Sequence, residues 1–260
     1  MAEIRASGTW GSSLSCGEFA AIRSVGFEPV GQVFGVSVYG AGSARAASCP
    51  PVLGPTVQAM YQARDAAVGR MTAECAELGG HGVVGVRVSR GSFAFGGLEF
   101  TAIGTAVRAP GAAYGRQEPF TCDLSGQDFA KLIMAGWVPA GLALGISIGS
   151  RHDDRTTARQ ARWTAGNVEV AGWTELVGES RHEARRQLDD DVRRIGAEGV
   201  VIADMQLRVS QRDCPVAAGR RDHVVEASVI GTAIARFSRA VRHNAEPALT
   251  VMRLTAGPSR

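Results

Sequence analysis

The sequence of 260 residues has few of the features that usually reveal a function. Its five cysteines form no Cys-x-x-Cys pair, and their odd number argues against a disulfide framework. Aromatic residues make up only 6% of the chain, and its 28 basic and 25 acidic residues are interspersed without a basic run. Because nucleic-acid binding requires a basic patch, we expect no nucleic-acid partner.

Long apolar runs are also scarce. The one membrane-like stretch, residues 132–148, contains Pro139 and several glycines, and the related stretch earlier in the chain carries Glu28 and Gln32. A helix that leads into a strand explains this pattern better than a bilayer span. Residues 1–11 are polar and lack the apolar core of a signal peptide. The sequence therefore predicts a cytoplasmic protein without a membrane partner.

Familiar catalytic motifs are missing as well. The sequence has no Gly-x-Ser-x-Gly elbow, no phosphate-binding GxxxxGK[ST] loop, and no His–Cys or Ser–His pair that recurs along the chain. These absences predict a protein that is not an enzyme. An active site at a subunit interface stays open as an alternative, because interfaces often hold pockets.

The sequence does contain an internal repeat. The stretch VGFEPVGQVFGVSV from Val25 recurs as AGWVPAGLALGISI from Ala135. Further matched pairs, at offsets that grow from 110 to 117 and 127 residues, are Leu14/Leu124, Ser15/Ser125, Phe19/Phe129, Gly79/Gly196 and Gly104/Gly231. Such self-similarity indicates one fold used twice. We expect one module over residues 1–110 and a second over 120–237, followed by a tail over 238–260.

Each copy predicts the same order of elements. Ser15 with Glu18, and Ser125 with Asp128, have the spacing of a capping box that begins a short helix. A strand, a long helix and two further strands follow. The apolar positions of the long helix match between the copies, and Cys75 occupies the position of Val192, so we interpret Cys75 as a small buried hydrophobic residue.

The first strand of each copy has one face of large apolar residues and one of small residues. In the second copy, the small face carries Gly141, Ala143, Gly145 and Ser147. Small residues in a strand favour the close approach of another backbone, while bulges or bends are the alternative explanation. The predicted fold class is α+β, with a three-stranded, antiparallel-type sheet packed on one long helix in each module. Such a module covers one sheet face only, which predicts association through its strand edges or its small-residue face.

The ends of both copies resemble a known family. LGGHGVVGVRV from Leu78 and FTAIGTAV from Phe100, with their copies IGAEGVVIADMQL and EASVIGTAI, resemble the helix end and last strands of the YbjQ family, which is described as heavy-metal-binding. The resemblance implies tandem dodecin-like β-α-β-β modules, here each preceded by a short helix. It also implies assembly into rings, commonly pentamers, and a homo-oligomeric partner. The tail is free to add an edge strand, to contact a neighbouring subunit or to bind a separate protein partner.

Two clusters are candidates for a metal site that would hold a divalent transition metal. His152, Asp153 and Asp154 follow one another in a loop of the second copy, and Cys214 and His223 lie in its strand–strand connection with Asp213 and Asp222. Histidine, cysteine and carboxylate side chains are the usual ligands of such metals. Surface loops also collect these residues by chance, and neither cluster recurs in the first copy.

A second set of polar residues suggests a small-ligand site. Arg87, Glu99, Asp204, Arg208 and Glu226 are expected on polar sheet faces, where cross-strand ion pairing is the alternative role. From all these features we expect a non-enzymatic, homo-oligomeric assembly or small-ligand-binding protein. The alternative is a metal-binding or metal-buffering protein with sites at subunit interfaces.

Overall fold

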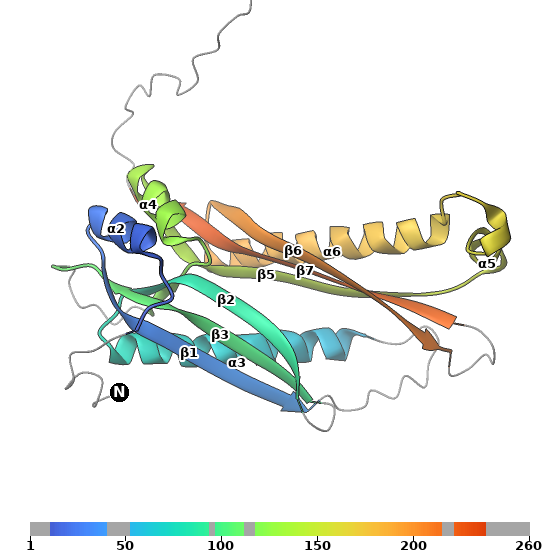
Figure 1. The fold of residues 1–260 in the computed structure, drawn as a ribbon, viewed down its shortest axis with the longest axis horizontal. Helices are drawn as coiled ribbons and strands as arrows, with labels where there is room; N and C mark the ends of the chain where they lie inside the picture. Colours follow the sequence, from blue (N-terminus) through green and yellow to red (C-terminus); the bar gives the residue numbers. More distant parts are fainter. Residues whose placement is uncertain (1–10, 41–52, 94–96, 112–117, 215–220, 238–260) are drawn as a thin grey trace, which may run out of the picture.

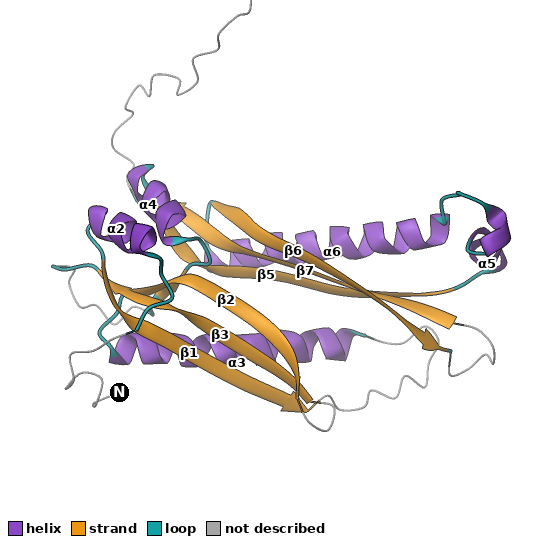
Figure 2. Ribbon diagram, in the orientation of Figure 1, coloured by secondary structure: helices purple, strands orange, loops and turns teal. Residues whose placement is uncertain are grey.

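The computed structural model describes residues 11–40, 53–93, 97–111, 118–214 and 221–237. It contains two sheets, two long helices and several short helices (Figures 1 and 2). In chain order, the elements are α2 (Cys16–Ser24), β1 (Glu28–Gly40), α3 (Gly54–Glu77), β2 (Gly82–Phe93), β3 (Gly97–Arg108), β4 (Phe120–Thr121), α4 (Gly126–Met134), β5 (Trp137–His152), α5 (Arg155–Gln160), η2 (Trp163–Ala165), α6 (Ala171–Ile195), β6 (Gly199–Asp213) and β7 (Arg221–Arg236). The predicted α+β class is confirmed, but the predicted tail lies outside the described residues.

The two sheets have the same strand order. The first sheet runs β1-β3-β2-β4 and the second runs β5-β7-β6, so in each the last long strand lies between the other two. These long strands pair antiparallel. The first sheet differs by the short strand β4, which pairs in parallel with β2 and comes from the segment that leads into the second half. Sequence analysis did not predict this additional strand.

The small-residue face of each first strand packs against the long helix of its own half. A Cβ atom at Gly145 would lie 1.9 Å from the carbonyl oxygen of Ala184 in α6, and one at Gly35 would lie 2.0 Å from that of Ala67 in α3. The expected close backbone approach is therefore present at these glycines. The alternative explanation holds at Gly141, beside a register shift in β5.

This packing corrects one expectation about association. The small-residue faces were expected to join subunits, but the helix of the same half already covers them, so they offer no docking surface. The opposite, large-residue face of the second sheet packs instead between the halves. Leu142, Leu144 and Ile146 of β5 share a core with Met60 and Met71 of α3.

A smaller core joins α2, α4 and β4. Phe27, Phe120 and Phe129 pack ring against ring, with Phe27 and Phe129 edge to face at a centroid distance of 5.2 Å. The predicted caps begin both helices: the Ser15 hydroxyl accepts from the Glu18 N–H, and the Ser125 hydroxyl accepts from the Asp128 N–H. The hydrogen bonds from the Ser15 N–H and hydroxyl also lower the pKa of Glu18.

The long helices confirm the predicted apolar stripe. Cys75 is fully buried in the first half, as expected from its match to Val192, and burial raises the pKa of its thiol to about 12. Among the described residues, no helix is both long enough and apolar enough to span a membrane.

Candidate functional site

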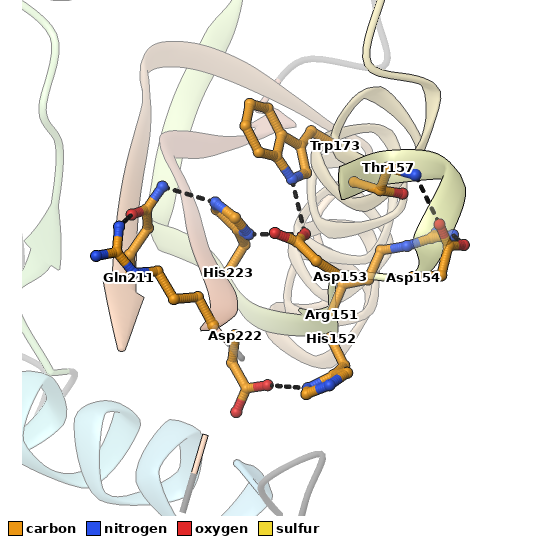
Figure 3. A network of polar contacts seen from close by, with 10 residues as sticks. Arg151, His152, Asp153, Asp154, Thr157, Trp173, Gln211, Asp222 and His223 are labelled. Atoms are coloured by element: carbon orange, nitrogen blue, oxygen red, sulfur yellow. Dashed lines mark hydrogen bonds and ion pairs between the residues drawn. The ribbon is translucent and has the colours of Figure 1, made fainter. Parts of the chain in front are cut away.

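The two predicted ligand clusters meet at one end of the second sheet, where β5 and β6 end and β7 begins (Figure 3). The strand register aligns His152 of β5 with Asp222 of β7, and Asp222 with Arg212 of β6. The next row aligns Arg151, His223 and Gln211. Because neighbouring residues of a strand point to opposite faces, the two rows build two different polar sites.

The first site lies on the sheet face away from α6. His152 Nδ1 and Asp222 Oδ1 are 2.7 Å apart, and Asp222 is buried. One ligand atom each from His152, Asp222 and the buried Cys214 lies within 4.8 Å of the other two. Around a tetrahedral zinc ion, ligand atoms are spaced by about 3.5 Å, so small side-chain movements would bring these three into coordination range.

The chemistry of this first site suits a transition metal. Imidazole, thiolate and carboxylate are all ligands of Zn²⁺, and three protein ligands would leave a fourth position open. One feature competes with the metal: Asp222 Oδ2 accepts a hydrogen bond of 3.2 Å from Arg212. A bound cation would therefore share this carboxylate with a guanidinium group, which lowers the expected affinity.

The second site lies on the face toward α6. Asp153 Oδ1 lies 3.1 Å from His223 Nδ1 and also accepts a hydrogen bond of 3.1 Å from the Trp173 indole N–H. The rings of Trp173 and His223 lie 4.5 Å apart, and Gln211 Nε2 lies 2.7 Å from His223 Nε2. Both ring nitrogens of His223 thus have protein partners, which fits a role in fastening α6 to the sheet end.

The last predicted ligand, Asp154, serves a helix. Its carboxylate accepts from the Thr157 N–H at 2.7 Å and so caps the start of α5. Hydrogen bonds from Thr157 lower the pKa of Asp154. Sequence reasoning had grouped His152, Asp153 and Asp154 by adjacency, whereas the fold directs the three side chains to three different places. It missed Arg212 and Trp173, which only the register of β6 and the docking of α6 bring to the cluster.

Three of the five expected small-ligand residues line a cavity of about 220 Å³ between the two halves, whereas Arg87 and Glu99 are not part of its lining. Asp204, Arg208 and Glu226 reach it from the second sheet, and Arg90 reaches it from β2. Glu226 pairs with Arg90 at 2.5 Å, so this ion pair joins the halves. Register places Arg208 opposite Glu226, but the carboxylate makes its ion pair across the cavity instead.

A third feature is the outer edge of β5, which the first half covers with side chains. Arg64 of α3 donates to the carbonyl oxygen of Leu142 at 3.1 Å, and Tyr61 of α3 accepts from the N–H of Ile146 at 2.8 Å. Arg64 is buried and Tyr61 is half-buried, and burial raises the pKa of Tyr61. Asp191 of α6 accepts from the N–H of Leu144 at 2.9 Å. The edge groups of β5 that are exposed in an isolated sheet are thus satisfied within the chain.

The corresponding edge of β1 receives only part of this cover. Glu74, which matches Asp191 in the repeat, accepts from the N–H of Phe34 at 2.6 Å, and Arg70 donates to the carbonyl oxygen of Val36. Among the described residues, α3 makes the main helix contacts with β1, and α2 makes fewer. Phe34 and Val38, the counterparts of Leu144 and Ile148, are each 47% exposed.

Residues 28–110 match the YbjQ family, whose description is "Putative heavy-metal-binding". This region of the chain belongs to the YbjQ family. It is also 35% identical over 235 residues to the "Encapsulin nanocompartment protein Rv1762c" of Mycobacterium tuberculosis (strain ATCC 25618 / H37Rv), a match that covers 86% of this chain and 85% of that protein. The chain and this mycobacterial protein are thus members of one family. The YbjQ match ends before His152, so the polar cluster of the second half lies outside it.

Proposed function

We propose that this protein is a non-enzymatic homo-oligomer, built from two dodecin-like, YbjQ-like modules over residues 1–110 and 120–237, which acts in the cytoplasm as a scaffold or container. The observation that carries the proposal is the difference between the two equivalent strand edges. Helix α3 covers the edge and large-residue face of β5, while the same edge and face of β1 carry exposed Phe34 and Val38.

The occupant that fits the open face of β1 is helix α6 of a second copy. Within the chain, Arg64 and Tyr61 of α3 make the contacts to β5, and the repeat matches them to Arg181 and Gly178 of α6. Both α6 positions are exposed. Arg181 is able to donate to the carbonyl of Gln32 as Arg64 donates to that of Leu142. Gly178 carries no hydroxyl, so the contact between copies lacks the Tyr61 hydrogen bonds.

Such a contact is head to tail, because the second half of one copy meets the first half of the next. Heterologous contacts close into rings when the rotation between subunits permits it. The family resemblance favours a pentamer among the possible rings. The name of the mycobacterial relative supports a setting in an encapsulin nanocompartment, as a protein that assembles there with other copies. The cavity that Arg90, Arg208 and Glu226 line has a volume of about 220 Å³, which supports a small ligand as its occupant.

Light scattering after size-exclusion chromatography tests the proposal on a matched pair of variants. Val38 on the open face is 47% exposed, and Val168 in the loop before α6 is 50% exposed, so glutamate at either position costs the monomer little. Val38→Glu should lower the molar mass of the assembly, because a charge would be buried at the interface. Val168→Glu should leave it unchanged. A wild-type protein with the mass of one chain would contradict the proposal.

Metal binding is the second candidate function, favoured by the convergence of His152, Cys214 and Asp222. The three residues come from one chain, so this site differs from the interface sites expected from sequence. Zn²⁺ added to metal-free protein should raise the melting temperature, because a ligand of the native state stabilises it. His152→Ala should abolish this rise, and His182→Ala, on the exposed face of α6, should retain it. An unchanged melting temperature in Zn²⁺, Ni²⁺ and Cu²⁺ would contradict metal binding.

A further inference from the structure

Strand β6 exposes a region whose counterpart in β2 is buried. In β2, Val83 and Val84 are fully buried and Val86 is 2% exposed. The repeat matches Val84 to Val201, which is 37% exposed, and the neighbouring Ile202 is 42% exposed. The two strands have the same partner, the last strand of their own half, along one edge. The difference lies along the other edge.

The segment that covers the outer edge of β2 is β4 with the residues after it. Its backbone makes four hydrogen bonds with β2 and the residue before it. The N–H of Phe120 donates to the carbonyl of His81, that of Cys122 to Val83, that of Val86 to Cys122, and that of Gly85 to Leu124. Their N···O distances run from 2.9 to 3.2 Å. This parallel strand leads into α4 and so belongs to the start of the second half. The start of one half therefore completes the sheet of the half before it.

The first half has a segment of the same kind. Residues 11–14 lead into α2 as residues 121–124 lead into α4, and the pairs Leu14/Leu124 and Ser15/Ser125 mark the match. Each segment contacts the equivalent threonine of its own half. Ser13 lies 3.4 Å from the Thr105 hydroxyl, and the Asp123 N–H donates to that of Thr232, the counterpart of Thr105, at 3.0 Å.

The two segments differ in what lies on their other side. Residues 121–124 pair with β2, whereas residues 11–14 form no strand in the described part of the chain. Within the described residues, no backbone hydrogen bond joins residues 11–14 to a strand, and the Leu14 N–H donates to the Ser12 hydroxyl instead. In the same part of the chain, no strand pairs with the outer edge of β6, at the position where β2 is paired. The two unpaired elements belong to opposite halves of the chain.

We propose that residues 11–14 of one copy add a parallel strand to β6 of a second copy. This inference rests on the proposed head-to-tail assembly and names the strand exchange that fastens it. The register follows from the β2–β4 pairing, in which Thr121 lies opposite Val83: Gly11 lies opposite Val200. The N–H of Ser12 donates to the carbonyl of Val200, and the N–H of Ile202 donates to that of Leu14. Main-chain pairing of this kind is a common way to complete an open sheet edge.

Mixed-chain disulfide formation tests the register. One preparation carries Gly11→Cys and the other Val200→Cys; the two are mixed, allowed to exchange subunits and oxidised. Mass spectrometry of the peptides should find a disulfide between the two introduced cysteines, because directly opposed residues of paired strands lie within disulfide range. A mixture of Gly11→Cys with Val168→Cys is the control and should give no such peptide.

The outcomes separate this inference from the assembly itself. An oligomer of unchanged mass that gives no Gly11→Cys to Val200→Cys disulfide overturns the strand exchange and leaves the head-to-tail assembly standing. A monomer overturns both. Hydrogen exchange addresses the chain's own C-terminal tail as the occupant: if the amide of Ile202 is protected in the full chain but not in a chain truncated after Phe237, the tail covers β6 and the inference is wrong.

Discussion

The two halves of the molecule share a strand order but are incomplete in opposite places. In the first half the sheet edge at β2 is covered and the large-residue face of β1 is exposed. In the second half the face of β5 is covered and the edge at β6 is exposed. Each half supplies what the other lacks: α3 covers β5, and the segment from Phe120 covers β2. In the proposed assembly, the exposed surfaces at one end of the chain therefore meet those at the other end of a second copy.

This reciprocity explains why duplication alone does not complete the structure. The two halves of one chain form one interface. In the proposed assembly, the first half keeps the open face of β1 and residues 11–14 for a neighbour, and the second half keeps the edge of β6 and the exposed side of α6. A closed ring satisfies both, because each copy then meets the opposite end of each of its neighbours.

The largest effect on stability is expected where the first strand of each half packs against its own long helix. Gly145→Ala places a Cβ 1.9 Å from the backbone oxygen of Ala184, and Gly35→Ala places one 2.0 Å from that of Ala67. Helix and strand must separate in both cases, so each variant should lose about 3 kcal/mol or more of unfolding free energy in urea titrations. Gly178→Ala, with open space around the new methyl group, should instead gain up to about 1 kcal/mol. A well-tolerated alanine at Gly35 or Gly145 would refute the close packing.

The next prediction compares the helix-to-strand hydrogen bond of the buried β5 edge with the equivalent bond at the exposed β1 edge. Asp191 is buried and accepts from the Leu144 N–H, while its counterpart Glu74 accepts from Phe34 at a more exposed edge. Asp191→Ala should cost about 2 kcal/mol, because it leaves a buried N–H without a partner. In a monomeric Val38→Glu background, Glu74→Ala should cost less than 1 kcal/mol, roughly the value of a solvated bond. Equal losses in that background would mean that the chain itself covers both edges alike.

A smaller effect is expected where the halves carry different residues at one position. Cys75→Val introduces the residue found at Val192 and should change stability by less than about 1.5 kcal/mol, because the volumes are similar. In the wild type, the thiols of Cys75 and Cys122, both with a pKa of about 12 from burial, should resist iodoacetamide, while the exposed Cys16 reacts. Rapid alkylation of Cys75 in the native state would contradict its burial.

The smallest effect concerns pH and the two lead-in segments. Burial raises the pKa of Asp123 above its ordinary value of 3.8, so folding favours its protonated form. Its contribution to stability is then complete below the unfolded pKa and is lost as pH rises through the higher folded pKa. Asp123→Ser, which introduces the residue of the counterpart Ser13, should lose less stability between about pH 4 and pH 7 than the wild type. Urea titrations at the two pH values measure the difference, and an identical loss would contradict this role of Asp123.

The sequence predicts the elements of each half well, because they follow from local signals. The capping serines, the helix stripe that contains Cys75 and the glycines opposite the long helices all appear where expected. The packing between halves was not predictable. No local signal marks Tyr61 and Arg64 of α3 as the residues that contact β5, and β4 is a strand only because β2 pairs with it.

The candidate site shows the same limit. Sequence analysis found its residues as two separate clusters, because His152 and Asp222 are brought together only by the pairing of β5 with β7. Adjacent residues in a strand diverge to opposite faces, which is why Asp153 contacts Trp173 rather than joining His152. Arg212 carries no sequence signal of its own, and the register of β6 alone places it beside Asp222.

Native mass spectrometry of the untagged, full-length protein tests the central claim most directly. Head-to-tail pairing of complementary ends predicts one closed species whose mass is an integer multiple of the chain's 27.2 kDa, and which Val38→Glu dissociates. A single species with the mass of one chain at micromolar concentration would contradict the account, because the exposed ends would then have no partner.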